Sequence, residues 1–236
     1  MKHAKKRFCY VVAGLLLMLI AFRLYLPYAA ATYINTTLSQ SEQYDGRVGD
    51  VDLMLWRGAY SLEYVLLYKA NGQIDKPLFK ADYVEFTLSW SQLFKGAAVG
   101  RVVVNSPEIN FVDGNSEEKS QSGKNENWLS IADQLFPLRI DKLTINQGKI
   151  AFHNPDTSPA IDIALHDIQL EVNNLVNSDD LSDTRVATAK AKGQTAEQGT
   201  ISLNAKLNPA TEAPTFDLDI QADNVEIGRA SCRERV

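Results

Sequence analysis

Apolar and polar residues alternate with a period of two along most of this chain, and that pattern constrains its fold more than any other feature. Successive side chains of a β-strand point to opposite faces, so the alternation predicts strands with one apolar and one polar face. Turn-forming residues separate the alternating segments at hairpin spacing. The predicted strands lie at 51–55, 62–68, 84–90, 99–104, 108–112, 143–145, 150–152, 161–172, 185–195, 200–207 and 216–225.

The breaks between these segments predict turns and irregularities. Pro107 separates two strands, because a central strand does not tolerate proline. Asp45-Gly46 and Gln147-Gly148 predict turns, and the change of parity at His166-Asp167 predicts a β-bulge. A short helix or turn is predicted at Ser91–Lys95, and a helix at Trp128–Phe136.

The N-terminal segment differs from everything that follows it. Phe8–Phe22 is an unbroken apolar run of 15 residues, and Leu24–Ala31 beyond Arg23 stays apolar. Spanning a bilayer takes about 20 helical residues, so residues 8–31 predict a transmembrane anchor with Arg23 at its outer interface. Tyr33–Ser41 predicts a continuation of this helix. The alternative is a signal peptide cleaved near Ala29–Ala31.

Charge is distributed unevenly along the chain. The segment before residue 32 contains five basic residues and no acid, which predicts a cytoplasmic N-terminus, residues 1–7, and a periplasmic remainder. Fusion of a periplasm-active reporter after Val112 tests that orientation. Residues 32–225 contain 16 basic and 27 acidic residues, a balance that argues against nucleic-acid binding. Cys9 and Cys232 cannot form a disulfide framework within the strand region.

Two polar segments set the predicted domain boundaries. Residues 113–127 contain no aliphatic side chain, and they predict a flexible loop between β units at 32–112 and 128–225. The final segment, EIGRASCRERV, resembles the translation of a sequencing-adaptor read-through. We therefore interpret residues 226–236 as a non-native tail and the second β unit as truncated.

No catalytic or metal-binding motif is evident in the sequence. The histidines are His3, His153 and His166, and none belongs to a spacing typical of metal ligation or acid–base catalysis. Asp50-x-Asp52 and Asp217-x-Asp219 lie in alternating segments and are interpreted as solvated strand faces. We expect no enzymatic activity, no cofactor and no metal.

Two motifs resemble the AsmA-like superfamily, in particular a group of membrane-anchored envelope proteins. They are the segment Gly46–Tyr60 (GRVGDVDLMLWRGAY) and the segment Leu138–Phe152 (LRIDKLTINQGKIAF), which the resemblance interprets as a hairpin. The resemblance extends from Leu26 to about Val225. It implies a mainly β fold: a transmembrane helix followed by an elongated, curled antiparallel meander with an apolar groove and one or two short helices.

The resemblance also implies a function, an inner-membrane-anchored periplasmic protein that supports envelope lipid homeostasis by binding or passing phospholipid. The predicted groove residues are Leu53, Leu66, Phe86 and Val103. The alternative function is a periplasmic scaffold that binds envelope proteins through its sheet edges, without lipid. Equally, the apolar face could be ordinary core under a helix or second sheet.

Trp56 and Gly58 mark the most specific turn in the chain. We predict a positive φ or a close backbone approach at Gly58. We predict that Trp56 is buried against the end of the sheet; the alternative places it at the bilayer interface.

Overall fold

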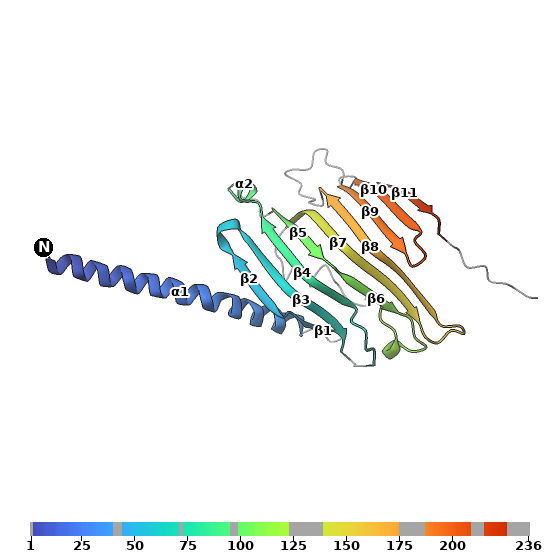
Figure 1. Ribbon diagram of the computed structural model, residues 1–236, viewed down its shortest axis with the longest axis horizontal. Coiled ribbons are helices and arrows are strands. Elements are labelled where there is room, and N and C mark those ends of the chain that lie inside the picture. Colours follow the sequence, from blue (N-terminus) through green and yellow to red (C-terminus); the bar gives the residue numbers. More distant parts are fainter. Residues whose placement is uncertain are drawn as a thin grey trace, which may run out of the picture.

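The computed structural model describes residues 2–39, 44–70, 73–94, 99–122, 139–174, 187–208 and 215–225. A long N-terminal helix projects from one end of a large curved sheet (Figure 1). The fold is mainly β, as the alternation predicts. The predicted helix at Trp128–Phe136 and the tail at 226–236 lie outside the described residues.

The helical elements are few. Helix α1 (Lys2–Leu38) continues the apolar segment outward, as predicted, and the short α2 (Trp90–Leu93) follows the fourth strand. Two single-turn 3-10 helices, η1 (Leu55–Arg57) and η2 (Glu117–Lys119), connect strands. The described strands form one sheet of 11: β1 (Tyr44–Arg47), β2 (Asp50–Met54), β3 (Ala59–Lys69), β4 (Phe79–Leu88), β5 (Val99–Asn105), β6 (Glu108–Val112), β7 (Arg139–Asn154), β8 (Ile161–Asn173), β9 (Ala187–Thr195), β10 (Thr200–Asn208) and β11 (Thr215–Asp223).

The strand order is β1-β3-β4-β5-β7-β8-β9-β10-β11, with β2 paired to β3 and with β6 paired to β4 and β7. Most neighbours are antiparallel, but β5 and β6 both run parallel to β7. The meander is therefore mixed, which corrects the prediction of a purely antiparallel sheet. Strands from both predicted β units pair directly, so the sheet is continuous across residues 113–127.

The predicted flexible loop is wrong for its first ten residues. Residues 113–122 contain η2 and return to the sheet, where Gln121 forms an antiparallel bridge with Val112 and is completely buried. Its side-chain amide donates a hydrogen bond to the carbonyl of Asn110, at 2.9 Å. Polar composition alone does not show that one glutamine in such a segment fills a buried position.

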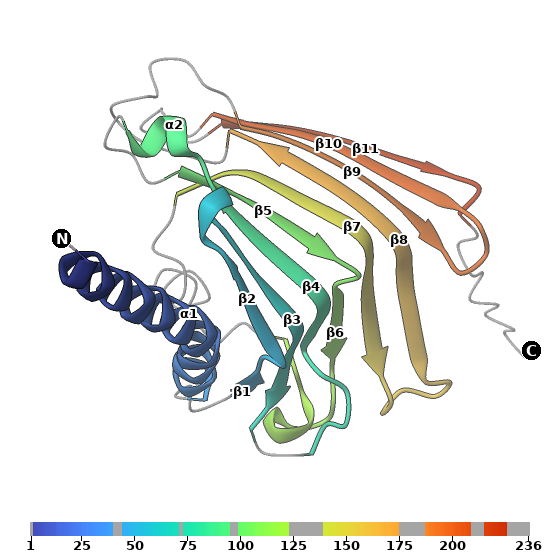
Figure 2. The same cartoon turned by 60° about the vertical axis from the view of Figure 1, so that its left-hand side comes forward.

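A line of backbone irregularities crosses the middle of the sheet. Non-glycine residues with positive φ, between 50° and 55°, occur on β3, between β5 and β6, on β7 and on β8: Tyr64, Ser106, Gln147 and Asp167. The residues beside this line are paired across four strands: Glu63 with Tyr83, Tyr83 with Asn105, and Asn105 with Asn146. Figure 2 shows β7 and β8 bending in their middle, where β5 gives way to β6. We call this feature the kink line.

The kink line overturns one sequence-based prediction and confirms another. Gln147-Gly148 is not a turn: β7 runs through it as a single 16-residue strand with an extra residue at Gln147. The predicted bulge at His166-Asp167 is confirmed, because the register between β8 and β9 shifts there. Each extra residue reverses the alternation, so the same face stays apolar on both sides of the bend.

The predicted turn at Asp45-Gly46 is also wrong, because both residues lie in β1 and pair with β3. A Cβ on Gly46 would lie 2.7 Å from Cβ of Leu38, on α1. The glycine therefore allows the helix to approach the sheet edge closely.

The kink line gives a direct test on β7. Deleting Gln147 should lower the free energy of unfolding by at least about 3 kcal/mol, because half of the strand would turn its apolar side chains to the polar face. Gln147→Gly keeps the extra residue and suits its positive φ, so it should stay within about 1 kcal/mol of wild type. Chemical denaturation of the full chain in detergent micelles compares the two. Equal stability of both variants would contradict the role of the bulge.

Candidate functional site: an apolar sheet face

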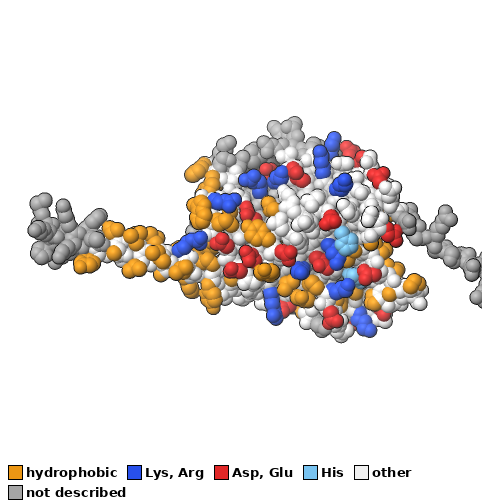
Figure 3. Space-filling view, viewed as in Figure 1, with side chains coloured by type: hydrophobic (Ala, Val, Ile, Leu, Met, Phe, Trp, Pro, Cys, Tyr) orange, Lys and Arg blue, Asp and Glu red, His pale blue; other side chains and the backbone are white. Residues whose placement is uncertain are grey.

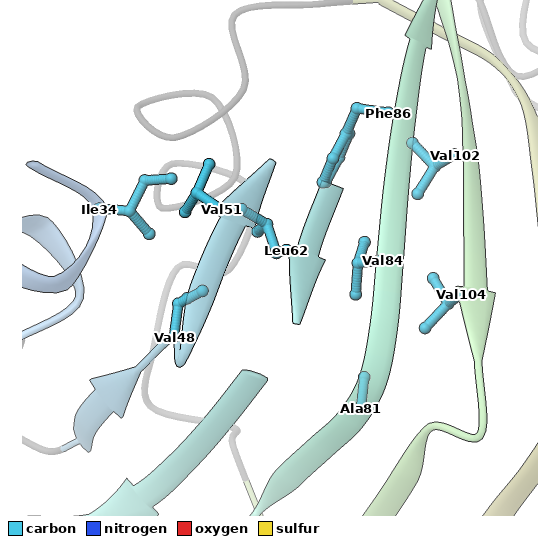
Figure 4. Packing of buried hydrophobic residues seen from close by; sticks show 9 residues of the cluster. All are labelled: Ile34, Val48, Val51, Leu62, Ala81, Val84, Phe86, Val102 and Val104. Atoms are coloured by element: carbon cyan, nitrogen blue, oxygen red, sulfur yellow. The ribbon is translucent and has the colours of Figure 1, made fainter. Parts of the chain in front are cut away.

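The end of α1 is packed against the first strands. Ile34 is buried in a cluster with Val48 and Val51, and Figure 4 shows its side chain pointing from the helix toward Val51. The Asn35 side chain donates to the carbonyl of Val48, at 3.2 Å, and accepts from its N–H, at 2.7 Å. This amide satisfies a backbone segment between β1 and β2 in the way a neighbouring strand would. The helix and the sheet are thereby joined by both apolar packing and directional hydrogen bonds.

The paired residues of the sheet form two continuous apolar rows. The rows are two residues apart along each strand, so both lie on the same face of the sheet. Each row crosses nine strands, from β2 to β11, without a polar side chain except the hydroxyl of Tyr60. The first row is Val51, Leu62, Val84, Val104, Ile145, Leu170, Ala191, Leu203 and Ile220; the second is Leu53, Tyr60, Phe86, Val102, Leu143, Val172, Ala189, Ala205 and Leu218. We call this surface the apolar face.

Exposure of the apolar face rises with distance from α1. Val51 on β2 is 2% exposed, whereas Ile220 on β11 is 58% exposed. The buried part, from β2 to β5, is the core of the protein (Figure 4). The outer part contains seven large side chains exposed to solvent: Ile150, Phe152, Ile161, Ile163, Phe216, Leu218 and Ile220. A large contiguous patch of exposed apolar side chains usually marks a site of interaction.

The kink line keeps the outer part on the same side as the core. A Cβ on Gly193 would contact both Ile168, at 3.2 Å, and Leu165, at 3.8 Å. These two residues are three apart in β8, so strict alternation would place them on opposite faces. The bulge at Asp167 brings both to the apolar face.

The opposite face is mostly polar. On β10 and β11 it pairs Asn204 with Asp219 and Lys206 with Asp217. On β7 and β8, Lys142 lies 2.8 Å from a carboxylate oxygen of Glu171. This hydrogen bond lowers the pKa of Glu171 below its ordinary value. The two faces of the sheet thus differ sharply in chemistry, and the polar one is suited to water.

The four predicted groove residues divide between the two faces. Leu53 and Phe86 belong to the second apolar row, in its buried part, and their predicted contact with lipid stays a prediction. Val103 lies between Val102 and Val104 and therefore points to the opposite face. Leu66 also lies on the opposite face, paired with Arg47 and Lys80, because the alternation reverses at Tyr64.

The sequence interpretation also missed the outer residues of the apolar face. Their signal was present in the alternation at 161–165 and 216–220, but alternation does not show whether another layer covers a strand. Tyr60 was missed as well. Its ring stacks on Phe86 with centroids 4.8 Å apart, and burial raises the pKa of its phenol.

A polar cluster lies at the other end of the sheet, around His153. Its Nδ1 is 2.9 Å from a carboxylate oxygen of Asp162, and its Nε2 is 3.3 Å from the side-chain oxygen of Asn110 and 3.3 Å from Nζ of Lys76. Within the described ranges, no three His, Cys, Asp or Glu side chains are grouped as metal ligands. These contacts join β7 to β6, to β8 and to the segment before β4, which is a structural role.

The end of the sheet nearest α1's apolar part carries exposed aromatic side chains. Trp56 is 72% exposed, and the Arg23 guanidinium carbon lies 5.9 Å from its ring centroid. The prediction that Trp56 is buried is therefore wrong. Gly58 has φ +61°, as predicted, and a Cβ there would lie 2.9 Å from the ring of Trp90. The turn needs glycine both for its backbone and for the aromatic ring that covers it.

Comparison of the chain with protein-family models and with curated proteins found no match. The likeness of its two motifs to the AsmA-like superfamily therefore stays a prediction.

Stability measurements separate the roles of Trp56 and Gly58. Trp56→Ala should change the free energy of unfolding by less than about 1 kcal/mol, because the side chain is exposed. Gly58→Val should cost about 2–4 kcal/mol, because a β-branched residue is strained at positive φ and meets Trp90. Denaturation curves of both variants in detergent test this. A large loss for Trp56→Ala would contradict the exposed position.

Proposed function

We propose that this protein is anchored in the bacterial inner membrane by α1 and binds the acyl chains of phospholipids on its apolar face. The observation that carries the proposal is the pair of apolar rows that run from the buried core to the solvent-exposed strand β11. Exposed apolar surface costs about 25 cal/mol per Å² relative to burial. Acyl chains are flexible, lack polar groups and match a surface of aliphatic side chains without hydrogen-bonding groups.

Membrane anchoring is supported by α1 itself. It is long and apolar enough to cross a bilayer, and its most apolar stretch is not buried by the protein. Ala30, Ala31 and Ile34 pack against the sheet, so cleavage near Ala31 would remove part of that contact. The five basic residues before residue 32 favour a cytoplasmic N-terminus and a periplasmic sheet. With the AsmA-like motifs, these features support a non-enzymatic role in envelope lipid homeostasis.

The second candidate function is a scaffold for envelope proteins. It is favoured by β11, whose outer edge is not paired with another strand of the described sheet. A peptide could add to this edge through backbone hydrogen bonds. The two candidates differ in what contacts the apolar face, since edge binding does not require lipid there.

Adjacent positions on β11 distinguish lipid from protein contacts. Ile220 lies on the apolar face and Gln221 on the polar face, and both are exposed. A photo-crosslinking amino acid at Ile220 should capture radiolabelled phospholipid in intact cells, whereas the same group at Gln221 should capture little. Protein adducts without phospholipid at Ile220, or equal lipid capture at both positions, would contradict the proposal.

A further inference from the structure

One end of the sheet carries exposed aromatic side chains that the proposed lipid binding on the apolar face does not explain. It consists of Trp56 and Arg57 on η1, together with Trp90, Leu93 and Phe94 on and after α2. All five side chains are exposed, and Phe94 reaches 85%. We call this surface the aromatic end.

The two elements that carry the aromatic end are held together. The ring of Trp90 covers Gly58, directly after η1, and stacks with Phe94 at a centroid distance of 6.3 Å. Leu88 N–H donates to the carbonyl of Gly58, at 2.8 Å, which joins the strand before α2 to the same turn. The aromatic side chains are therefore presented by a defined turn and a defined helix, side by side.

The position of the aromatic end along α1 indicates what it contacts. η1 and α2 are the parts of the sheet that lie nearest the N-terminal end of the helix (Figure 1). Figure 3 shows hydrophobic side chains gathered at that end of the domain, above the exposed apolar helix. Arg23 follows directly after the 15-residue apolar run, and its guanidinium lies over the ring of Trp56. Trp56 is thus at the level at which the apolar run ends.

We infer that the aromatic end is seated in the headgroup layer of the bilayer that α1 spans. Tryptophan is enriched at membrane interfaces, because its ring is apolar and its N–H remains hydrated. Arg23 and Arg57 add guanidinium groups, which donate hydrogen bonds readily to phosphate oxygens. Phe94 and Leu93 enter the upper acyl region. The sheet then stands on the membrane at two points, the helix and the aromatic end.

This seating fixes where the apolar face begins. Leu53 and Tyr60 flank η1 in sequence and start the second apolar row, so the row opens beside the headgroup layer. The inference rests on the proposed anchoring by α1 but not on lipid binding by the sheet. Interfacial seating and acyl-chain binding can therefore fail independently.

Tryptophan quenching by brominated phospholipids tests the seating in proteoliposomes of the full chain. Two single-tryptophan variants retain only Trp56 or only Trp90, with the other tryptophans replaced by phenylalanine. The control retains no native tryptophan and carries Tyr64→Trp. Tyr64 is an exposed residue of β3 and lies beside Gly49, near the end of α1 that packs against the sheet. Flotation with the vesicles reports anchoring by α1 separately.

Bromine near the glycerol end of the acyl chains should remove roughly half of the emission of Trp56 and of Trp90 and leave the control almost unchanged. Floating protein in which Trp56 and Trp90 are quenched no more than the control would overturn the inference. Strong quenching of all three would overturn it as well, because the sheet would then lie flat on the bilayer. Failure to float would overturn the anchoring on which the inference rests.

Discussion

Keeping one face of a bent sheet apolar is the constraint on which the rest of this structure depends. A strand alternates its side chains strictly, and a sheet that bends sharply must break that alternation or change its geometry. Here Ser106, Gln147 and Asp167 adopt the left-handed region at the same level of neighbouring strands. The register shifts on β7 and β8 show that Gln147 and Asp167 are extra residues. The sheet bends, and the apolar rows on the two sides of the bend remain on one face. The buried core and the exposed outer strands are consequently a single surface.

The joint between α1 and the sheet orients this surface. Asn35 binds both backbone groups of Val48, Gly46 gives room to Leu38, and Ile34 enters the core. These contacts are on the last two turns of the helix, whereas Arg23 contacts Trp56 farther toward the N-terminus. Contacts at two levels of one helix restrict tilting of the sheet. The apolar face begins beside α1 and continues outward with the Tyr60 hydroxyl as the polar group in its two rows, which is the geometry that the proposed binding of acyl chains requires.

Much of the fold follows from local sequence. The alternation predicts most strands, Pro107 separates β5 from β6, and Gly58 marks a turn with positive φ. The parity of some strands does not follow, because Tyr64 and Gln147 adopt positive φ without being glycine. Leu66 was consequently placed on the wrong face. The parallel pairing of β5 with β7 depends on a long connection, which hydrophobic periodicity does not describe.

The candidate site was predictable only in part, for a physical reason. Alternation shows that a strand has an apolar face but not what covers that face. Val84 and Ile220 have the same pattern, yet one is core and the other is solvated. Trp56 illustrates the same point, since a large aromatic side chain beside a turn fits a buried position and an interfacial one equally well. Exposure is a property of the whole assembly of strands and helix.

Native mass spectrometry of the full chain counts the phospholipids that remain bound and so measures lipid binding by the sheet. Lipids that surround α1 are unaffected by substitutions on β8 and β11, so differences between variants report the sheet alone. We expect Ile163→Asp combined with Ile220→Asp to lose bound phospholipid relative to wild type, whereas Gln221→Asp should retain it. An unchanged lipid count in the double variant would contradict lipid binding on the apolar face.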